Sequence, residues 1–91
     1  YWYASKNGKR AAELIQAVMC DVLRLPDRGL KPVKCKSDRG YYYFKDTRMP
    51  ALMLEPAFAA SHVTDCDRLE ERVDALCVAI ARAIDGYFQQ V

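Results

Sequence analysis

Two long stretches of the chain have the hydrophobic periodicity of amphipathic helices. In the first, from Lys9 to Arg24, apolar residues recur every three or four positions, and a Pro and a Gly follow as stop signals. In the second, from about Thr64 to Gly86, one apolar stripe lies opposite charged residues, and Thr64 with Asp67 resembles a capping box. We therefore predict one long helix in each half of the chain.

The remaining segments are predicted as strands. Residues 1–4 and 41–44 are aromatic, as strands favour, whereas residues 30–36 alternate only weakly. Residues 51–54 form a short continuous apolar run, typical of a strand covered on both faces, and Pro50 fits at its first position. The order of the elements predicts an α/β fold, a partial three-layer structure in which helices flank a mixed or parallel sheet.

Composition adds limits on partners. The 91 residues are 52% hydrophobic and 29% charged, an ordinary globular balance, and the net charge of +2 arises from intermixed acidic and basic residues. Charges mixed in this way give no sign of a nucleic-acid partner, and no apolar stretch is long enough to predict a membrane span. The chain begins within an aromatic run and has few elements for a layered sheet, so we expect residues 1–91 to be a single partial domain of something longer.

Cysteine and histidine residues do not form a metal motif in this sequence. The four cysteines are too far apart for a zinc knuckle, and Cys20 and Cys77 lie on or beside apolar helical stripes, where we expect buried thiols. His62 is the only histidine and lacks a partner at HxxE or HExxH spacing, so we interpret it as a loop residue. No metal ligand is therefore predicted within this chain.

Glu55 is the strongest candidate for chemistry. It follows the most hydrophobic segment of the protein, and open α/β sheets bind ligands at the carboxyl ends of their strands. A carboxylate in that position is suited to moving protons. The alternative is a strand-end glutamate that forms a salt bridge with a nearby Lys or Arg.

Three motifs together resemble a known family. They are Asp27-Arg28-Gly29-Leu30-Lys31, the run from Phe44 through Pro50-Ala51 to Glu55, and Phe58. In this order they are similar to the C-terminal half of the zinc-dependent N-acetylmuramoyl-L-alanine amidases of the cell-wall amidase type. The resemblance implies the C-terminal portion of an amidase catalytic domain, with the fold of that half of the enzyme.

The resemblance also implies a function. Glu55 would be the general acid/base in hydrolysis of the amide bond between N-acetylmuramic acid and L-alanine, and peptidoglycan would be the partner. Arg48, Phe58 and Ser61 are the expected substrate-binding residues. Zn²⁺ would be the cofactor of the intact enzyme, held by two histidines and a glutamate upstream of Tyr1, so this chain alone would be inactive. The expected location is the cell envelope, either in the periplasm or outside the cell. Alternatively, the chain belongs to a phage lysin that acts on the host cell wall.

Departures from the family pattern leave alternatives open. Members usually continue after the glutamate with Gly-Phe and then Ser-Asn, where this chain has Ala57-Phe58 and then Ser61-His62. The chain is alternatively a non-catalytic binding or assembly module without zinc, or part of a carboxypeptidase-like zinc hydrolase. A scattered basic set could meet peptide carboxylates or simply be solvated. This set is Arg28, Lys31, Lys45 and Arg48.

Overall fold

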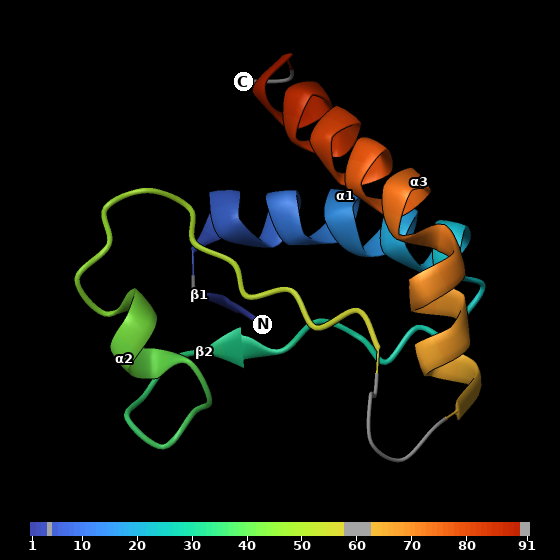
Figure 1. Cartoon of the computed structure of the whole chain (residues 1–91). Coiled ribbons are helices and arrows are strands. Elements are labelled where there is room, and N and C mark those ends of the chain that lie inside the picture. The colour runs from blue at the N-terminus through green and yellow to red at the C-terminus, as the bar shows by residue number, and fades with distance from the viewer. Residues whose placement is uncertain (4, 58–62, 90–91) are drawn as a thin grey trace.

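Two long helices dominate the computed structural model, which describes residues 1–3, 5–57 and 63–89. They are α1 (Lys6–Leu23) and α3 (Val63–Gln89), and they pack against each other (Figure 1). Between and before them lie three short elements, β1 (Trp2–Tyr3), β2 (Pro32–Val33) and α2 (Tyr41–Phe44). Both helix predictions are confirmed.

Local hydrogen bonds set the ends of α1. The Ser5 hydroxyl accepts a hydrogen bond of 3.0 Å from the N–H of Gly8, which satisfies one of the donors left open in the first turn. At the other end Arg24 adopts the left-handed conformation with φ of 55°, and its N–H donates to the carbonyl of Cys20. The helix therefore ends before the Pro and Gly that the sequence offers as stop signals.

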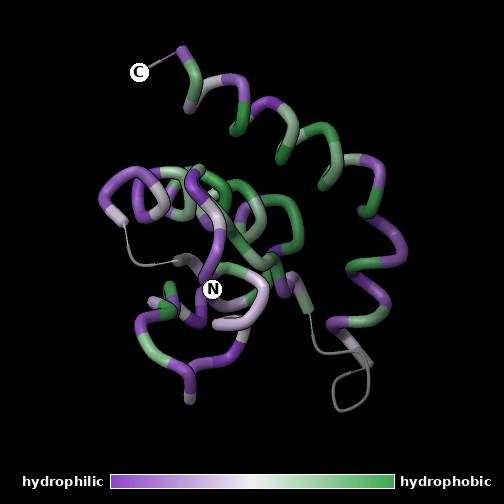
Figure 2. Tube along the Cα trace, turned by 90° about the vertical axis from the view of Figure 1, so that its left-hand side faces the viewer, coloured by the Kyte–Doolittle hydropathy of each residue, from purple (hydrophilic) through white to green (hydrophobic). Residues whose placement is uncertain are grey.

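The hydrophobic core lies between α1 and α3. Ile15, Met19 and Leu23 of α1 and Leu76 of α3 form a buried cluster, and Figure 2 shows the hydrophobic positions of the two helices on the sides that face each other. Burial of the Leu23 side chain alone contributes about 1.5–3 kcal/mol of hydrophobic stabilisation. Packing of the two helical stripes is thus the main source of stability.

Side chains of α3 also hold the C-terminal end of α1. Arg68 donates to the carbonyl oxygen of Leu23 at 3.3 Å, and Arg72 donates to that of Val22 at 3.0 Å. These carbonyls have no partner within the helix, so the arginines complete its last turn. Near the opposite end of α1, Arg10 lies 5.0 Å from the ring centroid of Tyr87. The two helices therefore run antiparallel.

The predicted three-layer α/β fold is wrong. β1 and β2 are two residues each and pair in parallel, with Trp2 opposite Pro32, and Leu52 adds one antiparallel bridge to Trp2. Among the described residues no larger sheet is formed, and α1 covers these extended segments on one side while α3 packs against α1 (Figure 1). The described part of the chain is a helix pair with a small patch of extended backbone.

Specific residues explain why the expected strands do not form. Pro50 and Pro56 lack N–H donors on both sides of the apolar run, which limits its pairing. After β2, the Asp38 carboxylate accepts hydrogen bonds from the N–H groups of Lys34 at 2.7 Å and Cys35 at 3.1 Å. These N–H groups therefore cannot form the hydrogen bonds of a longer β-ladder. The extended segments are thereby kept short.

The aromatic run Tyr41–Phe44 is a helical turn instead of the predicted strand. Gly40 precedes it with φ of 86°, a conformation that glycine adopts without strain, and the chain then bends so that the N–H of Lys45 donates to the carbonyl of Tyr41. Phe44 is buried, whereas Tyr42 is exposed. Alternate residues of a strand would share a face, so this burial pattern excludes a strand.

Candidate functional site

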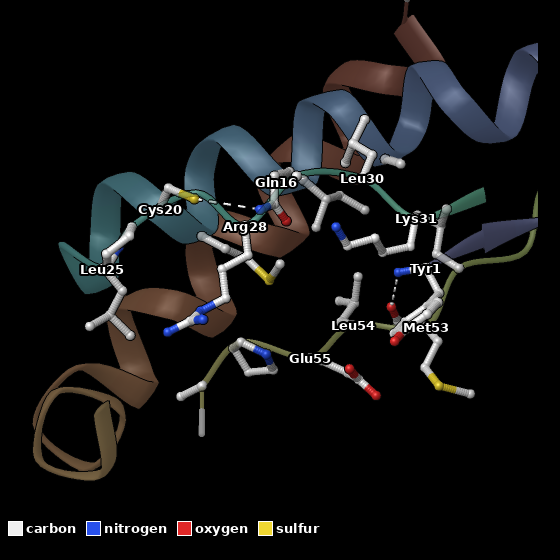
Figure 3. A pocket seen from close by; sticks show the side chains of 18 of the residues that line it. Tyr1, Gln16, Cys20, Leu25, Arg28, Leu30, Lys31, Met53, Leu54 and Glu55 are labelled. Carbon is white, nitrogen blue, oxygen red and sulfur yellow. Dashed lines mark hydrogen bonds between the residues drawn. The ribbon is translucent and has the colours of Figure 1, made fainter. Parts of the chain in front are cut away.

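A cavity of about 610 Å³ lies beneath α1, between two extended segments. Its apolar wall comes from Ile15 and Met19 of α1 and from Leu52. The loop between α1 and β2 forms a second wall, and residues 52–57 form the third, as Figure 3 shows. A volume of this size is typical of small-ligand sites, which are commonly ~300–1,000 Å³.

Glu55 lines this cavity. Its segment is not the predicted buried strand, because only Leu52 makes a bridge there and the side chain of Glu55 is 40% exposed. Its Oε1 atom lies 3.4 Å from the Nη1 atom of Arg39. The salt bridge considered as an alternative role for Glu55 is thus present, and it lies at the rim of a cavity.

Tyr1 holds the Glu55 segment in place. The amino group of Tyr1 donates to the carbonyl of Met53 at 3.0 Å, and the N–H of Met53 donates to the carbonyl of Tyr1 at 2.9 Å. This reciprocal pair is antiparallel, so the start of the chain lies beside the segment that carries Glu55.

Arg39 joins Tyr1 to Glu55. Its guanidinium lies 5.8 Å from the ring centroid of Tyr1. Hydrogen bonding to Tyr1 raises the pKa of Arg39, and the negative charge of Glu55 raises it further. Sequence reasoning missed Arg39, because nothing in the order of the residues indicates that the side chain of Arg39 reaches a carboxylate 16 positions later.

The second wall carries two cations on a braced loop. The Asp27 carboxylate accepts hydrogen bonds from the side chain of Gln16 at 2.8 Å and from the N–H of Gly29 at 2.7 Å, and these bonds lower the pKa of Asp27. Gly29 has φ of 84°, which turns the chain toward the cavity. Arg28 and Lys31 extend from this loop into the lining (Figure 3).

Other predicted site residues lie elsewhere. Arg48 is exposed and is not among the residues that line the cavity, so its binding role stays a prediction. Lys45 forms an ion pair of 3.3 Å with Asp46. Phe58, Ser61 and His62 fall outside the described residues.

The cysteines differ from one another in exposure. Cys77 is exposed, so its expected burial is wrong, whereas Cys20 is half-buried. Burial raises the pKa of the Cys20 thiol, and the charge of Asp27 adds to this effect.

The described residues do not fit a zinc ion by themselves. Within residues 1–3, 5–57 and 63–89, no three His, Cys, Asp or Glu side chains lie close enough to hold a metal. A catalytic zinc needs about three protein ligands and an open position. Among the same residues, no helix is both long enough and apolar enough to span a membrane.

Comparison of the chain with protein-family models, curated proteins and solved structures found no match in any of the three.

Proposed function

We propose that this chain is part of a peptidoglycan amidase that cleaves the N-acetylmuramoyl-L-alanine amide bond, with Glu55 as the general acid/base. The support from the sequence is the ordered resemblance of the Asp27–Lys31 turn and the Pro50–Glu55 segment to zinc-dependent cell-wall amidases. The support from the structure is a cavity that these same two segments line together, 24 positions apart in the chain as counted from Lys31 to Glu55.

One observation carries the proposal: the antiparallel pair of Tyr1 and Met53. In an antiparallel pair, the residues that precede one partner lie opposite the residues that follow the other partner. Any residues joined to the amino group of Tyr1 would therefore run alongside Leu54 and Glu55. The resemblance expects a metal-binding histidine just upstream of Tyr1, and this register would bring it next to the Glu55 carboxylate.

The role of Glu55 is to move one proton. Its carboxylate takes a proton from the attacking water, whose oxygen adds to the carbonyl carbon of the lactyl group. It then delivers this proton to the nitrogen of L-alanine as the C–N bond breaks. The products are a lactyl carboxylate and the free amine of the peptide. The described residues alone do not form a zinc site, and the ligands that the resemblance implies would lie upstream of Tyr1.

The test is Glu55→Gln in the longer protein that the proposal requires. We expect release of peptide amines from purified peptidoglycan to fall by roughly 10²–10⁴-fold, the usual contribution of a general acid/base. Asp46→Asn is the matched control, because the Asp46 carboxylate is exposed and pairs with Lys45. Circular dichroism checks that both variants fold. Full turnover in Glu55→Gln would sink the assignment.

The same experiment separates the enzyme from the binding module. An amidase releases amines and contains zinc in the longer protein. A module sediments with peptidoglycan, releases no amines and contains no stoichiometric zinc by mass spectrometry. For the 91-residue chain alone, we expect neither zinc nor turnover.

A further inference from the structure

An exposed apolar stripe follows α3 for about four turns. Its members recur at intervals of three or four residues, the spacing that places side chains on one side of a helix, and they are Val73, Cys77, Ala81, Ile84 and Phe88. Val73 is 44% exposed, Ile84 42% and Phe88 67%. Single exposed apolar residues are common, whereas a continuous row of them marks an interaction surface. This stripe is separate from the positions of α3 that pack on α1, such as the buried Leu76.

One edge of the exposed stripe is acidic. Asp74 follows Val73 and Asp85 follows Ile84, so each aspartate is turned by about 100° in the same direction around the helix from its neighbour in the stripe. Glu70 lies one turn before Asp74, and all three carboxylates are exposed. Neither Glu70 nor Asp74 makes an ion pair with the described residues, and like charges one turn apart destabilise a helix. This acidic edge of Glu70, Asp74 and Asp85 therefore carries negative charge that a cationic partner would neutralise.

The nearby arginines leave the acidic edge without a counter-charge. Arg68 and Arg72 donate hydrogen bonds to carbonyl oxygens at the end of α1, so their guanidinium groups are directed to that helix. Arg82 is two positions from Ile84 and lies on nearly the opposite side of α3. Arg10 of α1 forms its cation–π contact on the side of α3 that packs on α1. The charge along the exposed stripe is therefore negative.

A second copy of this chain fits the exposed stripe poorly. Helices that pair in antiparallel orientation across a two-fold axis place the same edge of both copies side by side. The acidic edge of one copy would then lie along the acidic edge of the other. Because juxtaposed like charges oppose association, the surface favours a partner of opposite charge.

We propose that the exposed stripe of α3 binds a basic amphipathic helix of another protein. The apolar side of that helix covers Val73, Ile84 and Phe88, and its lysines or arginines lie along the acidic edge. Phe88 contributes a large apolar surface to this contact. The stripe spans ~24 Å, the length of about 16 residues of a partner helix. None of the residues of the stripe or its edge lines the cavity, so the proposal is independent of the amidase assignment.

Fluorescence anisotropy with two synthetic peptides tests the proposal on the 91-residue chain. Both peptides have about 16 residues, with Leu at helical spacing along one side. One has Lys beside the leucines, and the matched peptide has Glu at the same positions. We expect the Lys peptide to bind and the Glu peptide to bind at least roughly ten-fold more weakly at low ionic strength, with a smaller difference at high salt. Absence of Lys-peptide binding, or equal binding of both peptides, would overturn the proposal.

Variants locate the bound peptide. Phe88→Ser and Ile84→Ser should each weaken binding of the Lys peptide at least roughly five-fold, and Asp74→Asn by about two- to five-fold. Tyr42→Ser is the matched apolar control, because Tyr42 is as exposed as Phe88 but belongs to α2, away from α3 (Figure 1). Asp46→Asn is the control for charge. Circular dichroism checks that each variant folds. Equal losses in the variants and their controls would contradict the proposed surface.

Alkylation of Cys77 separates this partner from other occupants. The Lys peptide should slow the reaction of the exposed Cys77 with iodoacetamide, measured by peptide mass spectrometry, and leave that of the exposed Cys35, outside the stripe, unchanged. In the longer protein without peptide, Cys77 should react as fast as in the 91-residue chain. Protection of Cys77 there would show that the rest of that protein covers the stripe, and a dimer in sedimentation velocity that Phe88→Ser dissociates would show a second copy. Either result would overturn the proposal.

Discussion

Replacing Phe44 by Ala should destabilise the protein far more than replacing Tyr42 by Ala. Phe44 is 5% exposed and Tyr42 is 68% exposed. Loss of a buried Phe typically costs about 3–5 kcal/mol, because the cavity left behind collapses only partly. Tyr42 makes an edge contact with Tyr41 at 5.3 Å between ring centroids, and its removal from the surface should cost less than about 1 kcal/mol.

Thermal unfolding followed by circular dichroism measures the difference. In a domain of this size, each 1 kcal/mol lowers Tm by about 4–8 °C, so Phe44→Ala should lower it by more than about 10 °C. Tyr43→Ala is the control for an exposed aromatic in the same turn. If residues 41–44 were a strand, Tyr42 and Phe44 would share a face and their substitutions would cost similar amounts. Equal losses would therefore refute the helical turn.

Two further predictions concern backbone geometry and pH. Gly40→Ala should destabilise the protein more than Gly29→Ala, although both glycines have positive φ. A Cβ at Gly40 would lie 3.2 Å from the Phe44 ring, whereas at Gly29 only the Lys31 side chain comes within 4 Å. Comparison of the Tm values of the two variants checks this order. Hydrogen bonds from the backbone lower the pKa of Asp38, so its contribution to stability is complete above its unfolded pKa and is lost as the pH falls through the lower folded value. In an NMR titration, the amide signal of Lys34 should shift in that acid range, and it should not shift there in Asp38→Asn. Titration of Asp38 at its ordinary pKa would contradict the hydrogen bonds from the backbone to its carboxylate.

The helices were predictable because their signal is local. A stripe such as Ile15, Met19 and Leu23 recurs at the period of the α-helix, so it specifies both the element and its buried face. A strand depends on a partner that can lie anywhere in the chain. The apolar run before Glu55 fits a buried strand by composition, yet its flanking prolines and scarce partners leave it with a single bridge at Leu52.

The candidate site was predictable only in part, for the same reason. Glu55 and the turn containing Arg28 and Lys31 were singled out as residues, and the structure brings them to one cavity. Arg39 was missed, because its contact with Glu55 depends on where an intervening turn points. Arg48 was grouped with the other cations by charge, although charge alone does not say which face a residue occupies.

The bond between Tyr1 and Met53 joins positions 52 residues apart and closes a loop around α1 and β2. Helical proteins usually fold quickly because their contacts are local, whereas closing long loops must precede distant contacts. The link from Arg68 to Leu23, 45 positions apart, adds a second closure of similar length. Folding should therefore be slow for so helical a chain. Because residues 52–57 form one wall of the cavity, the cavity exists only after the loop from Tyr1 to Met53 has closed.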